Sequence, residues 1–506
     1  MPASHHLALA AAACSGGALL LALIEPWLRL LHPSEYSPST PPWLAVAAAL
    51  ASSSVPPATD ADHALVSLAV LPPPIRAAVA ALREAAARGR AEELMGAAAR
   101  DTLFMLDAEW TYLNHGSYGA ALRLAVEAQR YFQDRLEAQP VLFQEEQALG
   151  ALRQAQLAVA GLVGAEPRDL VFVANATTAI NAVLQSTQLG AGDLILLAST
   201  TYPAVRSAAA RVAAQRGAAL LEVDLLDALA GPPGAVLRRF EAALQAGSGR
   251  VRLAILDHVI SSAPVHLPVA PLAALCRRHG AAVLVDGAHA VGAVPLDIPA
   301  LGCDYYTSNL HKWACTPKGA AFLWAARSRQ RDLLPLVTSH GYGLGFQGEF
   351  LWSGTSDWSA VMAVPTALAV LQALEPAASE YRTALLRQAV GLLLAAWGTS
   401  GALGVQSPHA CMSAVEMPAF GSQPPTPRFA SAVQHALRDD HRIEVPVACA
   451  GGKLWCRISC QIYNTLADYQ KLADSVLQLA ASPPGRSTPE ARQRSASRLS
   501  EASEAE

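Results

Sequence analysis

Short apolar runs rich in β-branched residues alternate with Ala- and Leu-rich stretches between about Leu170 and Trp324. This alternation is typical of a mostly parallel sheet covered by helices, which places the chain in the α/β class. Ligands bind at the carboxyl ends of the strands in such sheets, so the polar residues that follow each run are expected to meet in one site. Seven runs are predicted to be strands, and they span Leu170–Asn175, Asp193–Ser199, Ala218–Leu225, Val251–Val259, Ala281–Gly287, Cys303–Leu310 and Gly319–Trp324.

The first predicted strand leads into a stretch that predicts a helix from Thr177 and Thr178 to about Gln185. The first turn of a helix has free backbone N–H groups and the positive end of the helix dipole, so it favours an anion such as phosphate. Threonine at this position also caps ordinary helices. The pattern therefore indicates either a phosphate site or a simple cap.

The fifth predicted strand ends in a carboxylate, Asp286, directly after a strongly apolar run. Burying an ionised carboxylate is unfavourable unless a cation or a strong donor meets it, and a protonated heterocyclic nitrogen would serve. A cap on the next helix is the alternative. Asp286 is therefore a candidate binding residue.

Lysine is rare in this chain, where only Lys312, Lys318, Lys453 and Lys471 are lysines among 37 basic side chains. Lys312 lies just past the sixth predicted strand, among aromatic residues and beside His311. Desolvation in such a place lowers the pKa of an amine and favours its use as a nucleophile. Lys312 is thus the candidate for chemistry that needs an amine, with a solvated surface lysine as the alternative.

The composition indicates a globular protein of several domains. The chain has 506 residues, of which 52% are hydrophobic and 15% charged, with a formal net charge of -4. These values exclude a disordered chain and a polycation that binds nucleic acid. The length allows roughly two to four domains. The cysteines contain no Cys-x-x-Cys pair, which predicts buried thiols in a reducing compartment and no metal site.

The two ends of the chain differ from its middle. Residues 7–24 form an uncharged apolar run, which indicates a cleaved targeting segment, a membrane anchor or a misassigned start codon. The stretch that follows, to about Pro74, is predicted to be a linker, and residues 481–506 a disordered tail. Membrane contact is expected only through residues 7–24. The localisation stays open between an organelle, the secretory route, a membrane and the cytoplasm.

Several motifs together resemble the class V aminotransferase family of fold-type I pyridoxal-phosphate enzymes, and within it the isopenicillin N epimerase-like branch. The resemblance covers about Asp101 to Leu479. It implies a large domain with a mostly parallel seven-stranded sheet, a smaller C-terminal α/β domain and a homodimer. The motifs are Val-Asp-Gly-Ala-His-Ala at 285–290, Ser-Asn-Leu-His-Lys-Trp at 308–313, Tyr-Leu-Asn-His-Gly-Ser-Tyr-Gly at 112–119, Asn-Ala-Thr-Thr at 175–178, Trp-Ser-Gly-Thr-Ser-Asp at 352–357 and Arg-Ile-Ser-Cys-Gln-Ile-Tyr-Asn at 457–464.

The same resemblance divides the chain into four parts. Residues 1–100 would be an N-terminal extension with a targeting or anchor segment, a linker and a helix. Residues 101–365 would be the large cofactor-binding domain with its N-terminal arm, and residues 366–480 the small domain. The disordered tail, 481–506, would follow.

The resemblance also implies how pyridoxal 5'-phosphate would be held. Lys312 would form the internal aldimine with the cofactor and later move the α-proton of the substrate. Asp286 would pair with the pyridinium nitrogen, and His289 would lie near the phenolic oxygen. Tyr202 resembles the aromatic residue that stacks on the cofactor ring, although packing in the core explains an aromatic residue at a strand end equally well.

Other residues would hold the phosphate and the substrate. The phosphate would be bound by Thr177 and Thr178, by Asn309 or Ser308, by His311 and, from the neighbouring subunit, by Thr355. Arg457 would bind the carboxylate of an amino-acid substrate, because a guanidinium matches a carboxylate with two hydrogen bonds. Pairing of Arg457 with an internal acid is the alternative. Asn114 and His115 resemble the loop on the substrate side of the site.

The family fixes the cofactor more firmly than the reaction. Epimerisation at the α-carbon and β-elimination across a C–S bond both fit, with His115, His340 and Tyr342 as partners of Lys312 for two-sided proton transfer. A cysteine desulfurase is a third reading, in which Cys449 would accept sulfur. A non-catalytic relative that keeps the fold as a scaffold is the last alternative.

Overall fold

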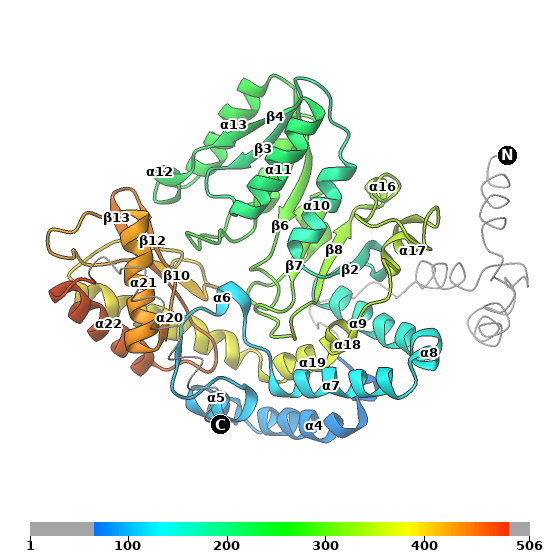
Figure 1. The fold of residues 1–506 in the computed structure, drawn as a ribbon, viewed down its shortest axis with the longest axis horizontal. Coiled ribbons are helices and arrows are strands. Elements are labelled where there is room, and N and C mark those ends of the chain that lie inside the picture. The colour runs from blue at the N-terminus through cyan, green and yellow to red at the C-terminus, as the bar shows by residue number, and fades with distance from the viewer. Residues whose placement is uncertain (1–64, 485–506) are drawn as a thin grey trace, which may run out of the picture.

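The computed structural model describes residues 65–484, and Figure 1 shows their arrangement. The predicted strands form one seven-stranded sheet in the order β2-β8-β7-β6-β5-β3-β4. Neighbouring strands from β7 to β4 are parallel, whereas β8 is antiparallel to both β2 and β7. The mostly parallel seven-stranded sheet is therefore confirmed. Its strands are β2 (Leu170–Val173), β3 (Leu194–Ala198), β4 (Ala219–Val223), β5 (Val251–Asp257), β6 (Ala282–Asp286), β7 (Tyr305–Asn309) and β8 (Ala321–Ala325).

Alternate residues of the central strands face two separate hydrophobic cores, because successive side chains of a strand point to opposite faces. On one face Ile255 and Leu284 pack with α10 and α11. On the other face Ala254 and Val283 pack with α13 and α14. Both faces are covered, which is why these strands consist of continuous apolar runs. The four covering helices are α10 (Ala176–Ser186), α11 (Pro203–Arg216), α13 (Ala235–Gly247) and α14 (Val269–Arg278).

The parallel strands end at the same edge of the sheet, and this edge positions the polar residues. Asp257 at the end of β5 is in register with Asp286 at the end of β6. The Lys312 turn follows β7, the next strand in the sheet. Polar side chains from three neighbouring strands thus meet above the carboxyl edge of the sheet.

The small domain has its own sheet and its own core. Its four strands are antiparallel in the order β12-β13-β10-β9. Leu386, Leu437 and Leu472, from its three long helices, share one buried cluster with Ile458 of β13. The elements are α20 (Ala377–Trp397), β9 (Ala402–Leu403), β10 (Met412–Glu416), α21 (Pro427–His441), β12 (Val447–Ala450), β13 (Lys453–Ser459) and α22 (Leu466–Ala481). A separate two-residue pairing joins β1 (Thr111–Tyr112) to β11 (Ile443–Glu444).

The hydrophobic cores of the two domains meet along α20. The helix α19 (Val364–Leu374) and Ala378 belong to the core of the large domain, whereas Leu385 belongs to that of the small domain. The core of the large domain thus extends past residue 365, and the boundary expected between 365 and 366 stays a prediction. Nearly every residue of α19 is buried, including its polar Thr366, so this helix lies within the core of the large domain.

The segment before residue 104 packs against both domains. Prolines at the first positions of a helix are favourable, and α4 (Pro73–Ala87) begins within the Pro-Pro-Pro run. The predicted linker to Pro74 therefore ends slightly earlier than expected. Ile75 and Val79 join the core of the large domain. Arg100 of α5 (Ala97–Leu103) forms an ion pair of 2.8 Å with Asp468 of α22.

The remaining helices complete the two domains. Shorter turns of other helical type are η1 (Leu68–Val70), η2 (Ala91–Leu94), η3 (Phe143–Gln147) and η4 (Pro167–Asp169). The α-helices are α6 (His115–Tyr118), α7 (Arg123–Ala138), α8 (Pro140–Leu142), α9 (Ala148–Leu162), α12 (Leu226–Leu229), α15 (Ile298–Leu301), α16 (Arg327–Gln330), α17 (Gly345–Leu351) and α18 (Ser359–Met362).

Two expectations about the whole chain can be compared with the described residues. All cysteines between 65 and 484 are free thiols, and only Cys449 is not buried. No single helix in this range is long and apolar enough to span a membrane, and one pair, Ser359–Leu374 with Ala377–Trp397, meets the length and composition only across a bend of 74°. The apolar run 7–24 and the tail from residue 485 onward lie outside the described residues.

Candidate active site

Lys312 lies in the turn after β7, where it is partly buried. Its Nζ lies 3.3 Å from Nε2 of His289. Burial lowers the pKa of Lys312 from 10.5 to about 8, the nearby Asp286 carboxylate opposes this shift, and Arg457 adds to it. A substantial fraction of the amine is therefore neutral near pH 8, as a nucleophile or a base requires.

Asp286 is buried at the carboxyl end of β6, with one side-chain oxygen engaged. Its Oδ1 accepts a hydrogen bond of 2.9 Å from the backbone N–H of Ala288. Burial raises the pKa of Asp286, and both this hydrogen bond and Lys312 act in the opposite direction. A protonated ring nitrogen near its other oxygen would supply the missing donor and the positive charge. Asp286 thus fits the pyridinium of pyridoxal phosphate.

His289 connects the lysine to the rest of the site. Its Nδ1 accepts a hydrogen bond of 3.5 Å from the indole N–H of Trp313, so the ring proton resides on Nε2. Nε2 also lies 3.3 Å from the hydroxyl of Ser261. Burial, first of all, and the charges of Lys312 and Arg457 hold the pKa of His289 well below its usual range. A neutral His289 can therefore donate from Nε2.

The amino end of α10 forms the candidate phosphate site. Asn175 caps the helix, and its Oδ1 accepts the N–H of Thr178 at 2.9 Å. Asn309, at the end of β7, accepts the N–H of Ala176 at 2.9 Å through Oδ1. The side chain of Thr177 is exposed beside this turn. A helix terminus with threonine hydroxyls suits an anion, so the residues present fit a phosphate.

Two other residues of the predicted phosphate set have internal partners. Nδ1 of His311 pairs with the carbonyl of Ala320 at 3.2 Å, and burial lowers the pKa of this imidazole to about 4. Ser308 donates a hydrogen bond of 2.6 Å to the carbonyl of Gly287 and is completely buried. Of the two alternatives left open by the sequence, Asn309 lies at the helix terminus and Ser308 points into the sheet.

Arg457 of β13 reaches from the small domain into the site. Its Nη1 donates to the carbonyl and the hydroxyl of Ser261, at 2.8 and 3.2 Å. Its Nη2 donates to Oδ1 of Asn114 at 3.0 Å and to Oγ of Ser117 at 2.8 Å. All four acceptors are uncharged, and within residues 65–484 no ion pair joins Arg457 to a carboxylate. A buried guanidinium without a counter-ion is suited to an anionic ligand.

His115 lies behind the lysine rather than open to the site. Its ring is fully buried, with Nε2 3.0 Å from the carbonyl oxygen of Lys312 and Nδ1 3.0 Å from the hydroxyl of Tyr463. Burial lowers the pKa of His115 to about 3. Of the two residues predicted on the substrate side, Asn114 contacts Arg457 and His115 contacts the backbone of the lysine turn.

Tyr202 and Thr355 are exposed in the single chain. Tyr202 directly precedes α11 and is 47% exposed. Thr355 lies between α17 and α18. Within the described residues no hydrogen bond joins either side chain to Lys312, His289 or Asp286, so their predicted contacts with the cofactor stay predictions.

Sequence reasoning missed Asp257 and Ser261. Asp257 is buried beside Asp286, and burial together with that carboxylate raises its pKa well above the usual value. The rule that selected Asp286, a carboxylate closing an apolar strand, applies equally to Asp257. Ser261 carries no such signal, because it belongs to an irregular loop and its position depends on the fold.

Comparison with known proteins gives one consistent picture. The family model "Aminotransferase class-V" matches residues 127–472. A putative L-cysteine desulfhydrase 1 from Oryza sativa subsp. japonica is 34% identical over 403 residues, which cover 73% of this chain and 83% of that protein. An isopenicillin N epimerase from Amycolatopsis lactamdurans is 32% identical over 392 residues, covering 74% and 96%.

A solved structure is similar as well. The cystine C–S lyase C-DES in complex with its reaction product cysteine persulfide has a TM-score of 0.60 and 25% sequence identity, and the match covers 73% of this chain and 97% of that one. A mutant of C-DES carries glycine covalently linked to the PLP cofactor. The span of the family model includes Asp286, Lys312 and Arg457.

Proposed function

Because this chain belongs to the class V aminotransferase family of pyridoxal-phosphate enzymes, we propose that it is a C–S β-lyase that releases sulfide from L-cysteine. The overall reaction converts L-cysteine and water into pyruvate, ammonia and hydrogen sulfide. The observation that carries this proposal is the partly buried amine of Lys312, 3.3 Å from His289, with the guanidinium of Arg457 near enough to lower its pKa and bonded only to uncharged groups.

Each residue has a part in this reaction. Pyridoxal phosphate, when bound, stabilises the electron pair left at the α-carbon after its proton is removed. Arg457 binds the carboxylate of cysteine and orients its α-proton. Nζ of Lys312 takes that proton and returns one to the leaving sulfur, so one base completes the elimination. Asp286 would hold the ring N–H of the cofactor, and Nε2 of His289, 3.3 Å from Nζ, orients the amine.

Racemisation by two-sided proton exchange needs a second acid or base across from Lys312. The three candidates, His115, His340 and Tyr342, support this reaction less well than elimination. Both ring nitrogens of His115 are engaged and the ring is buried. His340 and Tyr342 lie on the segment before α17, where Tyr342 is 71% exposed. A one-base elimination agrees with this arrangement better than racemisation does.

Sulfur transfer to Cys449 has weaker support still. Cys449 lies in β12, and the turn between β12 and β13 consists of Gly451 and Gly452, both with positive φ. Its thiol donates a hydrogen bond of 3.3 Å to the carbonyl of Pro425. A tight two-residue hairpin is much shorter and stiffer than a loop that must carry a thiol to the substrate.

Epimerisation at the α-carbon is the second candidate. The isopenicillin N epimerase from Amycolatopsis lactamdurans aligns with this chain over 96% of its length, and its name assigns it that reaction. The same residues, Lys312 and Arg457, would serve, with the second proton donor contributed by a residue of a neighbouring subunit. Measuring both products in one assay separates the two reactions.

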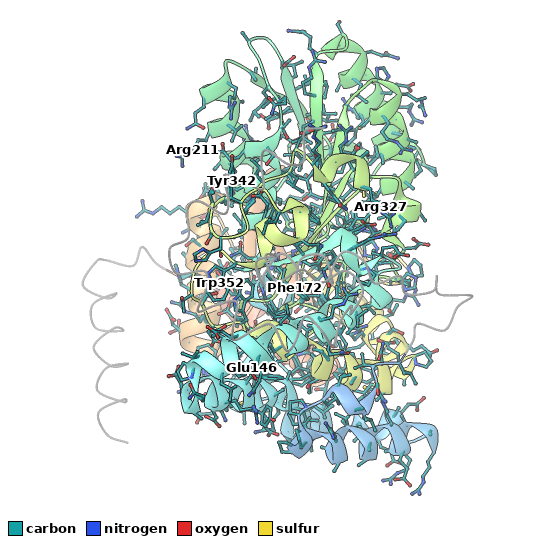
Figure 2. The ribbon with its side chains drawn as sticks, turned by 90° about the vertical axis from the view of Figure 1, so that its right-hand side faces the viewer. Glu146, Phe172, Arg211, Arg327, Tyr342 and Trp352 are labelled. Atoms are coloured by element: carbon teal, nitrogen blue, oxygen red, sulfur yellow. The ribbon has the colours of Figure 1, made fainter. Side chains whose placement is uncertain are left out.

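A homodimer forms part of the proposal. Leu334, Leu336, Val337 and Tyr342 are large apolar side chains that lie exposed between α16 and α17. Tyr342 and Trp352 lie on the face turned toward the viewer in Figure 2. Apolar side chains gathered on one segment are typical of a surface that another chain covers. Thr355, four residues after α17, would then reach the phosphate of the partner's site.

The experiment uses the full-length protein loaded with pyridoxal phosphate and incubated with L-cysteine in deuterated buffer. Sulfide, pyruvate and deuterium at the α-carbon are followed together. We expect sulfide and pyruvate in equal amounts, and the Lys312→Ala variant should lose this activity by at least about 1000-fold together with the visible absorbance band of the cofactor. Lys453→Ala, at an exposed site, is the matched control.

Other results would replace the proposal. Deuterium incorporation without pyruvate would identify epimerisation. Alanine in place of pyruvate, together with loss of sulfide release in the Cys449→Ser variant, would identify a desulfurase.

A further inference from the structure

The turn formed by residues 114–119, which contains α6, touches the lysine turn on one side and Arg457 on the other. Figure 1 shows α6 at the junction between the seven-stranded sheet and the small domain. The two groups belong to different domains, since Lys312 follows β7 and Arg457 lies on β13. This turn, called the α6 turn below, is therefore placed to control their separation.

On the lysine side, the contact is made by the ring of His115. The carbonyl of Lys312 can only accept a hydrogen bond, so the proton of His115 is on Nε2, 3.0 Å away. Nδ1 then accepts the hydroxyl proton of Tyr463 at 3.0 Å and the N–H of Ala120 at 3.3 Å. The ring also packs on Trp313, with 4.8 Å between the centroids. These contacts hold the orientation of the ring.

The backbone of the α6 turn lies close against the same lysine turn. Gly119 has a φ of 68°, and a side chain there would collide with the carbonyl of His311. Cys315 adopts a φ of 52°, rare for a residue other than glycine, and donates its N–H to the carbonyl of Lys312 at 3.0 Å. A strained backbone of this kind persists only where its surroundings hold it in place.

On the arginine side, the α6 turn supplies Asn114 and Ser117. They accept both hydrogens of one guanidinium nitrogen, Nη2 of Arg457. Ser459, two residues after Arg457 on β13, accepts the backbone N–H of His115 at 2.8 Å. The same short turn therefore holds the guanidinium, the strand that carries it and the lysine turn.

We propose that His115 is a positioning residue, which through the α6 turn sets the amine of Lys312 at its working distance from the guanidinium of Arg457. The proposal rests on the proposed roles of Lys312 and Arg457 and extends them, because it assigns the geometry between the two to a residue that touches neither substrate nor cofactor. Proton transfer is sensitive to such geometry, and a displacement of about 1 Å can lower a rate about 100-fold.

The test compares four variants of the full-length protein loaded with pyridoxal phosphate. His115→Phe keeps the ring and removes both hydrogen bonds, His115→Gln keeps one donor and one acceptor, and Tyr463→Phe removes only the hydroxyl that meets Nδ1. Ser117→Ala removes the hydroxyl that accepts a hydrogen bond from Nη2 of Arg457. The kcat and KM for L-cysteine are measured together with the dissociation constant for the cofactor and the pH midpoint of its visible band.

We expect His115→Phe to lower kcat about 10- to 100-fold and to shift the pH midpoint of the visible band, while KM and cofactor affinity change less than about threefold. His115→Gln should recover most of kcat, and Tyr463→Phe should change it in the same direction by a smaller factor. In the double variant His115→Phe, Ser117→Ala, the two effects should deviate from additivity by more than about threefold, because both act through one turn.

Additive effects, or a His115→Phe protein with unchanged kcat and an unchanged band midpoint, would overturn the proposal. If His115→Phe does not fold, Tyr463→Phe decides, since it removes one hydroxyl and leaves the ring in place. His435→Phe, at a partly exposed position of α21, is the control for replacing a histidine. If the proposed lyase reaction is wrong, the unchanged protein forms no pyruvate. This result differs from a failure of the role proposed for His115, which affects only the variants.

Discussion

At the residue scale, the chemistry of the site depends on charged side chains that have little contact with water. Lys312, Asp286 and Arg457 are all largely removed from water. Asp286 and Arg457 both shift the pKa of Lys312, and Lys312 in turn lowers the pKa of Asp286. Burial lowers the pKa of the amine, and the carboxylate restores part of it. The pKa of Lys312 is therefore set first by burial, which lowers it, and then by Asp286, which raises it, and Arg457, which lowers it further.

This balance predicts how the cofactor-free protein takes up pyridoxal phosphate at different pH values. Only the neutral amine attacks an aldehyde, so the rate of uptake should rise about tenfold per pH unit below about pH 8 and level off above it. The rise of the visible band after mixing measures this rate.

Two variants should move the midpoint of that pH profile in opposite directions. Asp286→Asn removes the charge that favours the protonated amine, so the midpoint should fall. Arg457→Gln removes a charge that disfavours it, so the midpoint should rise. Shifts of the same sign in both variants would contradict the assignment of these neighbours.

At the element scale, the amino end of α10 depends on side chains from two strands. Asn175 follows β2 and Asn309 ends β7, and each accepts one N–H of the first turn. Two N–H groups of the first turn thereby have acceptors, and the other N–H groups of this turn stay available to an anion. Capping and phosphate binding, which the sequence offered as alternatives, are compatible at this helix.

This arrangement predicts the effect of replacing Asn309. Asn309→Ala should leave the buried N–H of Ala176 without its partner and lower the free energy of unfolding by about 1–3 kcal/mol. It should also weaken cofactor binding, because the first turn loses its support. Urea unfolding of the cofactor-free protein and a cofactor titration measure the two effects, with Gln185→Ala in the last turn of α10 as the control. An unchanged stability would refute the role of Asn309 as a cap.

At the scale of the whole molecule, the site lies between two domains that an N-terminal segment also joins. The α4 helix packs on the large domain, and Arg100 pairs with Asp468 of the small domain. The proposed homodimer would add a third boundary, with Thr355 of each subunit at the phosphate of the other. Subunit mixing tests that proposal directly.

Two inactive variants should restore activity when mixed, if the sites are shared. Lys312→Ala removes the amine, and Thr355→Glu places a negative charge against the partner's phosphate. After dissociation and reassociation, about a quarter of the sites would combine an intact Lys312 with an intact Thr355, so about a quarter of the original activity should return. Mixtures that stay as inactive as their components would show that Thr355 does not act across subunits.

The sequence by itself determined the elements and the chemistry of single positions. Apolar runs of strand length indicated central strands such as β3, β5 and β6, because a strand buried on both faces is apolar over most of its length. The positions of Lys312, Asp286 and the helix after Asn175 followed from residue types at strand ends. These features are local, so a linear pattern is enough to reveal them.

Only the tertiary structure decided which of these side chains meet. It turned His115 toward the carbonyl of Lys312, placed Ser261 against Arg457, and paired Asp257 with Asp286 across two strands. It also showed that the core of the large domain includes the apolar residues of α19. Contacts between distant segments depend on strand order and on domain packing. The spacing of residues along the chain does not determine either of them.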